Sequence, residues 1–177
     1  MGVIAAVTGV SRYLGGKTAA WLVDQPGIDR VIGLDVVPPP APLACEFVRV
    51  DIRDQGISEL LERSNVDTVV HMGVIATPRQ AGGRSVMKDI NVIGTMQLLA
   101  ACQRVASIRH LVVKSTAAVY GAGPKDPALI TEDTVPQHPP TSGWAKDSVE
   151  AEPYIRSFAR RRHDVRVCTF RFANIVG

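Results

Sequence analysis

Residues 3–16 read VIAAVTGVSRYLGG, an apolar β-branched run followed by a turn with three glycines and the start of a helical pattern. Continuous apolar strands are typical of parallel sheets that are covered on both faces. Glycines permit a tight turn, and backbone N–H groups at the start of the following helix can bind a pyrophosphate. The stretch therefore predicts a strand, a phosphate-binding loop and a helix, in that order.

The rest of the chain continues this alternation of strand and helix. Further strand patterns lie at 30–35, 46–50, 66–71, 109–115 and 165–171, and helical patterns lie at about 14–24, 56–64, 86–105 and 144–162. Such alternation indicates parallel βαβ units, and right-handed crossovers then give a doubly wound α/β sheet, the Rossmann fold. We expect one domain over 1–177.

The composition limits the class of protein. The chain has 177 residues, of which 46% are hydrophobic and 21% charged, with a net charge of +3. This charge is too small to indicate a nucleic-acid partner, and no run approaches the ~18 apolar residues of a membrane span. The N-terminus lacks the charged region of a secretory signal. Three well-separated cysteines fit neither a disulfide framework nor a metal site, so we expect a cytoplasmic protein without a metal.

Two acidic residues at strand ends suggest which cofactor the loop would bind. Asp35 ends the second strand 20 residues after Gly15, where a carboxylate commonly binds the ribose 2′-hydroxyl. A carboxylate there repels a 2′-phosphate, which favours NAD over NADP. Asp51 follows the third strand, where it would face the adenine. The alternative is a glycine turn with an unrelated aspartate at a strand end.

A long loop marks the expected substrate side. Residues 121–143 carry five prolines and show neither strand nor helix periodicity. Loops of this length in compact domains are commonly functional. Because this one follows the carboxyl end of a strand, where ligands of such sheets bind, we expect the substrate there.

Six motifs occur in order along the chain: TGVSRYLG (8–15), DIRD (51–54), VVHMGV (69–74), INVIGT (90–95), STAAVYG (115–121) and RFANIVG (171–177). With them the chain resembles, over essentially its whole length, the extended short-chain dehydrogenases/reductases. The resemblance is to the NAD-dependent epimerase/dehydratase group, which includes UDP-glucose 4-epimerase. It implies an NAD-binding Rossmann domain whose C-terminal substrate lobe would follow Gly177 and is absent from this chain.

The resemblance also implies a set of site residues. The expected NAD contacts are Gly9, Ser11, Arg12, Tyr13, Leu14, Gly15, Asp35, Asp51, Ile52, Met72, Gly73, Asn91 and Lys146. Thr116 would hydrogen-bond the reacting hydroxyl, and Asn174 would contact the phosphates of a nucleotide-sugar, such as a UDP-sugar. Lys146 would bind the nicotinamide ribose and supply positive charge.

Two positions depart from the family pattern. Arg12 replaces a glycine of the phosphate loop, and its side chain either reaches the pyrophosphate or crowds the backbone. Ser142 stands four residues before Lys146, where the family has its catalytic tyrosine. A serine hydroxyl is shorter and far less acidic than a phenol. No other residue is therefore an obvious candidate for the proton transfer that the tyrosine performs in the family. Trp144 is expected to point elsewhere on the helix.

Three functions remain open on this basis. The first is a nucleotide-sugar epimerase or dehydratase that moves a hydride transiently between a UDP-sugar and NAD, with Thr116, Lys146 and Ser142 at the catalytic positions. The second is a catalytically silent dinucleotide-binding module that senses redox state or binds a partner. The third is an alcohol or steroid dehydrogenase of the same family.

The helix over 86–105 is apolar on more than one face, with Ile93 expected toward the sheet and Met87 and Leu99 free for another contact. In the family this helix and the one near 144–162 form a dimer interface, so we expect a homodimer; the alternative is a wide core stripe. His71 either lines the cofactor floor or is a core histidine whose hydrogen bonds are satisfied.

Overall fold

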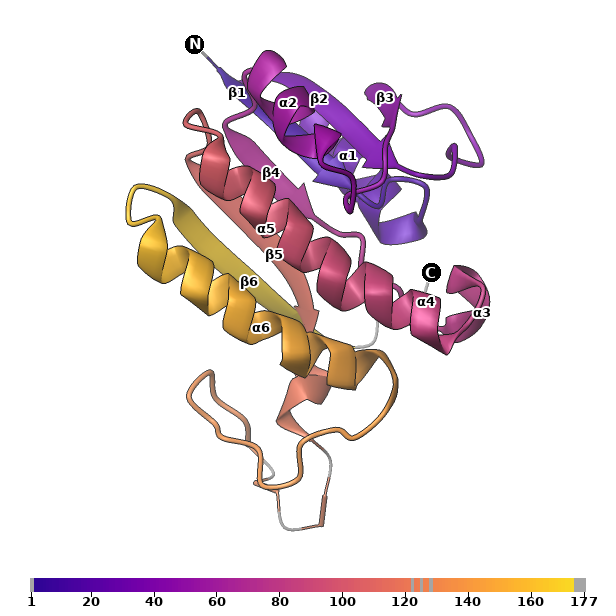
Figure 1. The fold of residues 1–177 in the computed structure, drawn as a ribbon, viewed down its shortest axis with the longest axis vertical. Helices are drawn as coiled ribbons and strands as arrows, with labels where there is room; N and C mark the ends of the chain where they lie inside the picture. Colours follow the sequence, from indigo (N-terminus) through magenta and orange to yellow (C-terminus); the bar gives the residue numbers. More distant parts are fainter. Residues whose placement is uncertain (1, 122, 125, 128, 174–177) are drawn as a thin grey trace.

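The computed structural model describes residues 2–121, 123–124, 126–127 and 129–173. Its sheet has six strands in the order β3-β2-β1-β4-β5-β6, and every neighbouring pair is parallel (Figure 1). The strands are β1 (Val3–Thr8), β2 (Ile28–Asp35), β3 (Glu46–Arg49), β4 (Thr68–His71), β5 (His110–Thr116) and β6 (Arg166–Phe172). The predicted doubly wound sheet is confirmed: the first strand covers the run VIAAVT (3–8), and the other five lie within two residues of their predicted bounds.

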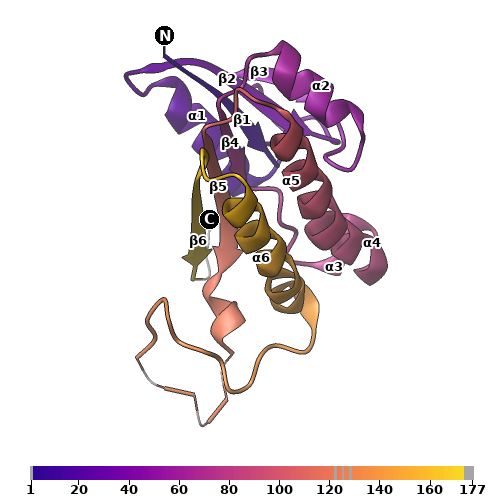
Figure 2. The ribbon, with the colours of Figure 1, turned by 60° about the vertical axis from the view of Figure 1, so that its left-hand side comes forward.

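Helices cover the two faces of the sheet unequally. They are α1 (Tyr13–Val23), α2 (Gly56–Arg63), α3 (Pro78–Ala81), α4 (Arg84–Lys88), α5 (Thr95–Arg104) and α6 (Gly143–Arg161), with a π-helical turn η1 (Asp89–Gly94) and a 3-10 turn η2 (Ala117–Tyr120). Figure 2 shows α2, α5 and α6 side by side on one face and α1 on the other. Two apolar cores follow from this arrangement, one under the three helices and a smaller one under α1.

The predicted helix over 86–105 is a composite. It runs from α4 through the π turn η1 into α5, and the extra residue of a π turn changes which side chains face the core. Met87 and Leu99 are buried, whereas Ile93 is 43% exposed, so the expected assignment of these three residues to faces was wrong. The π turn accounts for Ile93, which lies within it, and for Leu99, which follows it, because a helical period of 3.6 residues does not anticipate an extra residue. Met87 precedes the turn in α4, so the turn does not explain its burial.

Parallel strands bring their carboxyl ends to one edge of the sheet, and the sequence motifs gather there. The loops after β1, β2, β3 and β4 meet beside the start of α1, which places the phosphate loop at the centre of that edge (Figure 1). This is the edge at which open parallel α/β sheets bind ligands.

Candidate functional site

The phosphate loop joins β1 to α1 through backbone contacts that leave no room for side chains at two glycines. Gly9 has a φ of +76°, and a Cβ there would lie 2.6 Å from the Cα of Gly73. A Cβ on Gly15 would lie 2.2 Å from the carbonyl oxygen of Gly9. The first turn of α1 therefore packs directly on the loop, which directs its free N–H groups toward the edge of the sheet.

Arg12 fits into this loop without strain. It is the N-cap of α1, with φ −102° and ψ 155°, a conformation open to any residue. Its N–H donates to the Gly9 carbonyl at 3.2 Å, and its carbonyl accepts from the Gly16 N–H at 2.8 Å. The backbone of the loop thus forms with arginine in the place of glycine.

Asp35, at the end of β2, is tied to the phosphate loop. Its Oδ2 accepts from the Ser11 N–H at 3.1 Å, and its Oδ1 accepts from the Val36 N–H at 2.8 Å. The Ser11 hydroxyl in turn donates to the Val37 carbonyl. These bonds orient the Asp35 carboxylate beside the loop, as the sequence spacing predicts.

A first cleft opens beside Asp35. Its lining comprises Thr8, Gly9, Arg12, Leu34, Asp35, Val36, Val50, Asp51, Ile52, Arg53, Gly73, Ile75 and Ile90. Three isoleucines supply apolar walls, and the carboxylates and backbone groups supply polar contacts, the mixture that small-molecule sites use.

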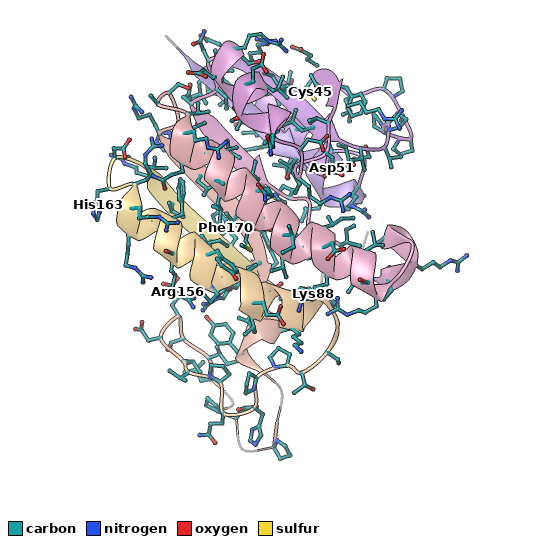
Figure 3. The ribbon with its side chains drawn as sticks, viewed as in Figure 1. Cys45, Asp51, Lys88, Arg156, His163 and Phe170 are labelled. Carbon is teal, nitrogen blue, oxygen red and sulfur yellow. The ribbon has the colours of Figure 1, made fainter. Side chains whose placement is uncertain are left out.

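Asp51 is partly engaged by its own neighbour. Arg53 donates to it through Nε at 2.9 Å and through Nη2 at 2.5 Å. This two-pronged bond is the main reason why the pKa of Asp51 is lowered. The carboxylate therefore stays ionised, and it lies just after the end of β3 (Figure 3).

A second cleft of about 760 Å³ opens on the other side of the loop. Its lining comprises Ser11, Arg12, Tyr13, Leu14, Gly15, Met72, Val74, Ala76, Thr77, Gln80, Lys114, Ser115, Trp144, Phe172 and Ala173. Arg12 lines both clefts, so they adjoin at the start of α1. An elongated ligand that crosses the phosphate loop could therefore contact both, although the first cleft encloses only about 60 Å³.

None of the three residues expected to act in catalysis lines either cleft. The Lys146 side chain is 44% exposed, with its Nζ 3.9 Å from Glu150, and Ser142 is the N-cap of α6. Neither lines the first or the second cleft, whereas Trp144 lines the second, contrary to the expectation that it points elsewhere. A helical register depends on where the helix starts, and α6 starts at Gly143.

Asn91 joins secondary-structure elements within the chain. Its Oδ1 accepts from the Ile75 N–H at 2.7 Å, and its Nδ2 donates to the Ile75 carbonyl at 2.9 Å and to Asp147 at 3.0 Å. Asp147 is fully buried and also pairs with Arg84, through contacts of 2.6 and 3.0 Å. This network holds the first turns of α6 against the segment after β4. Asn91 therefore positions the elements around the clefts through hydrogen bonds within the chain.

Thr116 lies outside both clefts. It is 2% exposed, and its Oγ1 accepts from the Ala118 N–H at 3.0 Å, which caps the turn η2. Asn174, the other residue expected to contact substrate, lies outside the described residues.

His71 is a buried histidine with both ring nitrogens satisfied. Nδ1 lies 2.7 Å from Thr8 Oγ1 and Nε2 lies 3.0 Å from Thr95 Oγ1. The Thr95 hydroxyl donates to the Asn91 carbonyl at 2.6 Å, so it accepts from Nε2. Burial, with a smaller effect from the charge of Lys114, lowers the pKa of His71 to about 4. The ring is therefore neutral at pH 7 and connects β1, β4 and α5.

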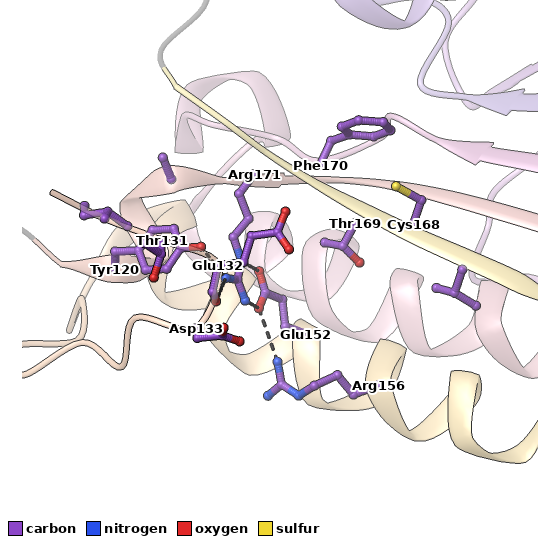
Figure 4. A pocket seen from close by; sticks show the side chains of 13 residues that line it. Tyr120, Thr131, Glu132, Asp133, Glu152, Arg156, Cys168, Thr169, Phe170 and Arg171 are labelled. Carbon is purple, nitrogen blue, oxygen red and sulfur yellow. Dashed lines mark hydrogen bonds and ion pairs between the residues drawn. The ribbon is translucent and has the colours of Figure 1, made fainter.

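A third hollow, of about 840 Å³, lies between α6, β6 and the long loop (Figure 4). Arg171 donates to Glu152 through Nε at 3.0 Å and through Nη2 at 2.7 Å, and to Tyr120 Oη at 2.6 Å. Burial opposes ionisation of Glu152, but bonds from Arg171 and Ser115 prevail and hold its pKa below the usual value. Loop residues 130–133 line this hollow and neither of the two clefts.

Two further features of the described residues bear on the class of protein. No helix among them has the length and apolar character needed to cross a bilayer. Within the same ranges, no group of three or more His, Cys, Asp or Glu side chains is placed to hold a metal ion. The doubly wound sheet, the glycine loop at a helix N-terminus and the acid at the end of β2 together define a Rossmann fold with the features of the dinucleotide-binding class.

Comparison with known proteins narrows this class to a family. The chain belongs to the NAD dependent epimerase/dehydratase family, whose model matches residues 5–177. It is 42% identical over 179 residues to an uncharacterized protein of Mycobacterium tuberculosis, covering 98% of this chain and 48% of the relative. It is 33% identical to a UDP-glucose 4-epimerase of Azospirillum brasilense, covering 97% of this chain and 49% of the relative. The chain thus spans about half the length of these curated relatives.

Solved structures agree with this fold. UDP-glucuronic acid 4-epimerase from Bacillus cereus, in complex with UDP-glucuronic acid and NAD, matches with a TM-score of 0.78 at 23% identity, over 96% of this chain and 56% of the other. MoeE5 in complex with UDP-glucuronic acid and NAD matches with a TM-score of 0.79 at 25% identity, over 97% of this chain and 54% of the other. The family resemblance of the sequence motifs is confirmed.

Proposed function

We propose that this chain is the NAD-binding part of a nucleotide-sugar epimerase or dehydratase. The observation that carries the proposal is the pair of adjoining clefts on either side of the phosphate loop. The adenosine would occupy the first cleft with its ribose at Asp35, the pyrophosphate would lie at the start of α1, and the nicotinamide half would extend into the second cleft. Bound there, NAD would supply a reversible hydride acceptor.

The residues present suit this ligand. The backbone contacts at Gly9 and Gly15 leave the N–H groups of the α1 N-terminus free for phosphate oxygens. Arg12 adds a guanidinium at the junction of the clefts, where it would neutralise a diphosphate. The isoleucine walls of the first cleft suit a flat adenine ring.

NAD⁺ is expected to stabilise the purified protein and NADP⁺ is not. At a hundred times its dissociation constant, NAD⁺ adds about 2.7 kcal/mol to the free energy of unfolding, measured as a thermal shift. NADP⁺ at the same concentration gives a much smaller shift, because Asp35 repels its 2′-phosphate. Asp35→Asn narrows the difference, and Asp133→Asn, exposed and outside both clefts, leaves it unchanged. Equal shifts, or none, contradict the proposal.

The substrate class comes from the relatives. Epimerases that share this fold are described as UDP-sugar enzymes, and two structures hold UDP-glucuronic acid with NAD. A UDP-sugar is therefore the substrate that we propose, and a cytoplasmic location is part of the same proposal.

One observation favours a catalytically silent dinucleotide-binding module as the second candidate. The side chains of Ser142, Lys146 and Thr116 lie outside the second cleft, and the tyrosine that lines it, Tyr13, comes from the phosphate loop itself. Turnover of a UDP-sugar by the unmodified protein would exclude the silent module. NAD⁺ binding without turnover of UDP-glucose or UDP-glucuronic acid would support it.

We further propose a homodimer through the helices over 86–105 and 144–162. Three large apolar side chains on these helices, Val86, Ile93 and Tyr154, are 40%, 43% and 42% exposed. Light scattering at micromolar concentration is expected to give twice the protomer mass, and Ile93→Glu is expected to shift it to the monomer. A monomer mass for the unmodified protein contradicts this proposal.

A further inference from the structure

Two cations face the second cleft without an acidic partner. Arg12 lines it from the phosphate loop and Lys114 from β5, and its lining residues include no aspartate or glutamate. Neither cation forms an ion pair with another residue in the described ranges. Lys114 and Arg12 therefore give the second cleft a positive charge, and the carboxylates of Asp35 and Asp51 border Arg12 only in the first cleft.

Lys114 is placed there by the alternation of β5. Val113 belongs to the core beneath the helices, and Ser115 donates to Glu152 of α6 at 2.8 Å. Because successive side chains of a strand point to opposite faces, Lys114 points to the face that α6 does not cover. Its half-buried ammonium has a lowered pKa, first because of burial and second because of Arg12. Both causes oppose the charge, and an anionic ligand would offset them.

The two forms of a nicotinamide dinucleotide differ in charge at one end. The oxidised ring is a cation and the reduced ring is neutral, whereas the diphosphate is anionic in both. This inference rests on the proposed function, which places the diphosphate near Arg12 and the ring in the second cleft. A fixed cation in that cleft repels the oxidised ring and leaves the neutral one unaffected.

We propose that Lys114 biases the second cleft toward the reduced dinucleotide, so that the protein binds NADH more tightly than NAD⁺. The positive charge in this proposal is that of Lys114 on β5. Lys146 on α6 does not supply it, because Lys146 pairs with Glu150 and does not line the cleft. Tighter binding of the reduced form raises the reduction potential of the bound couple. Lys114 would thus raise the reduction potential of the bound cofactor through its charge.

The test compares the dissociation constants of NADH and NAD⁺ for the unmodified protein and three variants. NADH is followed by its fluorescence, and NAD⁺ by competition against it. The unmodified protein is expected to prefer NADH by roughly tenfold, the size expected for one partly buried charge several ångströms from the ring. Lys114→Met abolishes most of this preference and Lys114→Arg retains it. Lys17→Met, on the exposed side of α1, leaves it unchanged.

The possible outcomes separate this inference from the proposed function. Binding of both forms with the same ratio in Lys114→Met as in the unmodified protein overturns the role of Lys114 and leaves the proposed function standing. Absence of binding of either form overturns both. If circular dichroism shows that Lys114→Met does not fold, the inference is tested by the relative affinities of NADH and NAD⁺ for the unmodified protein and for Lys114→Arg. A preference for NADH in both supports the inference, and equal or tighter binding of NAD⁺ by either protein overturns it.

Discussion

Gly15→Ala is expected to abolish detectable dinucleotide binding and to lower the free energy of unfolding by about 2–3 kcal/mol. The added Cβ would lie 2.2 Å from the carbonyl oxygen and 2.7 Å from the carbonyl carbon of Gly9. Both atoms belong to the backbone, so no side-chain rotation relieves the overlap. The start of α1 must move away from β1, and its N–H groups then no longer converge on one anion.

Thermal denaturation and calorimetric titration with NAD⁺ measure the two effects. Gly56→Ala is the matched control, because a Cβ there meets nothing within 4 Å at the first residue of α2. Alanine favours a helix over glycine by about 1 kcal/mol, so this control should retain or gain stability. Gly15→Ala with unchanged affinity would show that the close approach of α1 to the loop is not needed for binding.

Glu152→Ala is expected to cost about 3–5 kcal/mol, the loss expected when one partner of a buried ion pair is removed. Glu152 is 6% exposed and accepts two hydrogen bonds from the Arg171 guanidinium and one from the Ser115 hydroxyl. Its removal leaves the Arg171 charge partly buried without a counter-charge. It also loosens Tyr120, whose hydroxyl bonds to Arg171 and whose ring lies 4.8 Å from the guanidinium carbon.

Glu150→Ala, two residues earlier on α6, is the matched control. Glu150 pairs with Lys88 at 2.8 Å and with Lys146 at 3.9 Å, but its side chain is 31% exposed where that of Glu152 is 8% exposed. Exposed pairs contribute up to about 1 kcal/mol, so the control should lose no more than that in chemical denaturation. Equal losses in the two variants would contradict a stabilising role for the Glu152 network.

The contribution of Glu152 also depends on pH. Because the pKa of this carboxyl is lowered in the folded protein, the unfolded chain binds the proton more tightly. The stabilisation is complete above the ordinary pKa of a glutamate and is lost as the pH falls through the folded-state pKa. The difference in stability between the unmodified protein and Glu152→Ala should therefore shrink in acid.

The sheet and its ligand-binding edge could be predicted because local signals determine them. Apolar runs of four to eight residues between helical periods specify parallel strands, and parallel strands bring their carboxyl ends together. The glycines of the phosphate loop and Asp35 occupy fixed places relative to these strands. Their roles therefore follow from chain order alone.

The register of helices at the site could not be predicted in the same way. Asn91 lies within the π turn η1, where its side chain bonds to Ile75 and Asp147 of the same chain. The start of α6 at Gly143 similarly brings Trp144 to the second cleft and leaves Lys146 beside Glu150. A shift of one residue turns a helical side chain by about 100°, more than a motif match can resolve.

The sequence by itself determined the doubly wound sheet, the glycine loop and the acid at the end of β2, because each depends on the local order of residues. Only the tertiary structure decided which charged groups share a cleft. Lys114 is one of several polar residues in β5, and its importance appears only when the sheet sets it on the same cleft as Arg12. Electrostatic interactions depend on distance through space, which the spacing of residues along a chain does not specify.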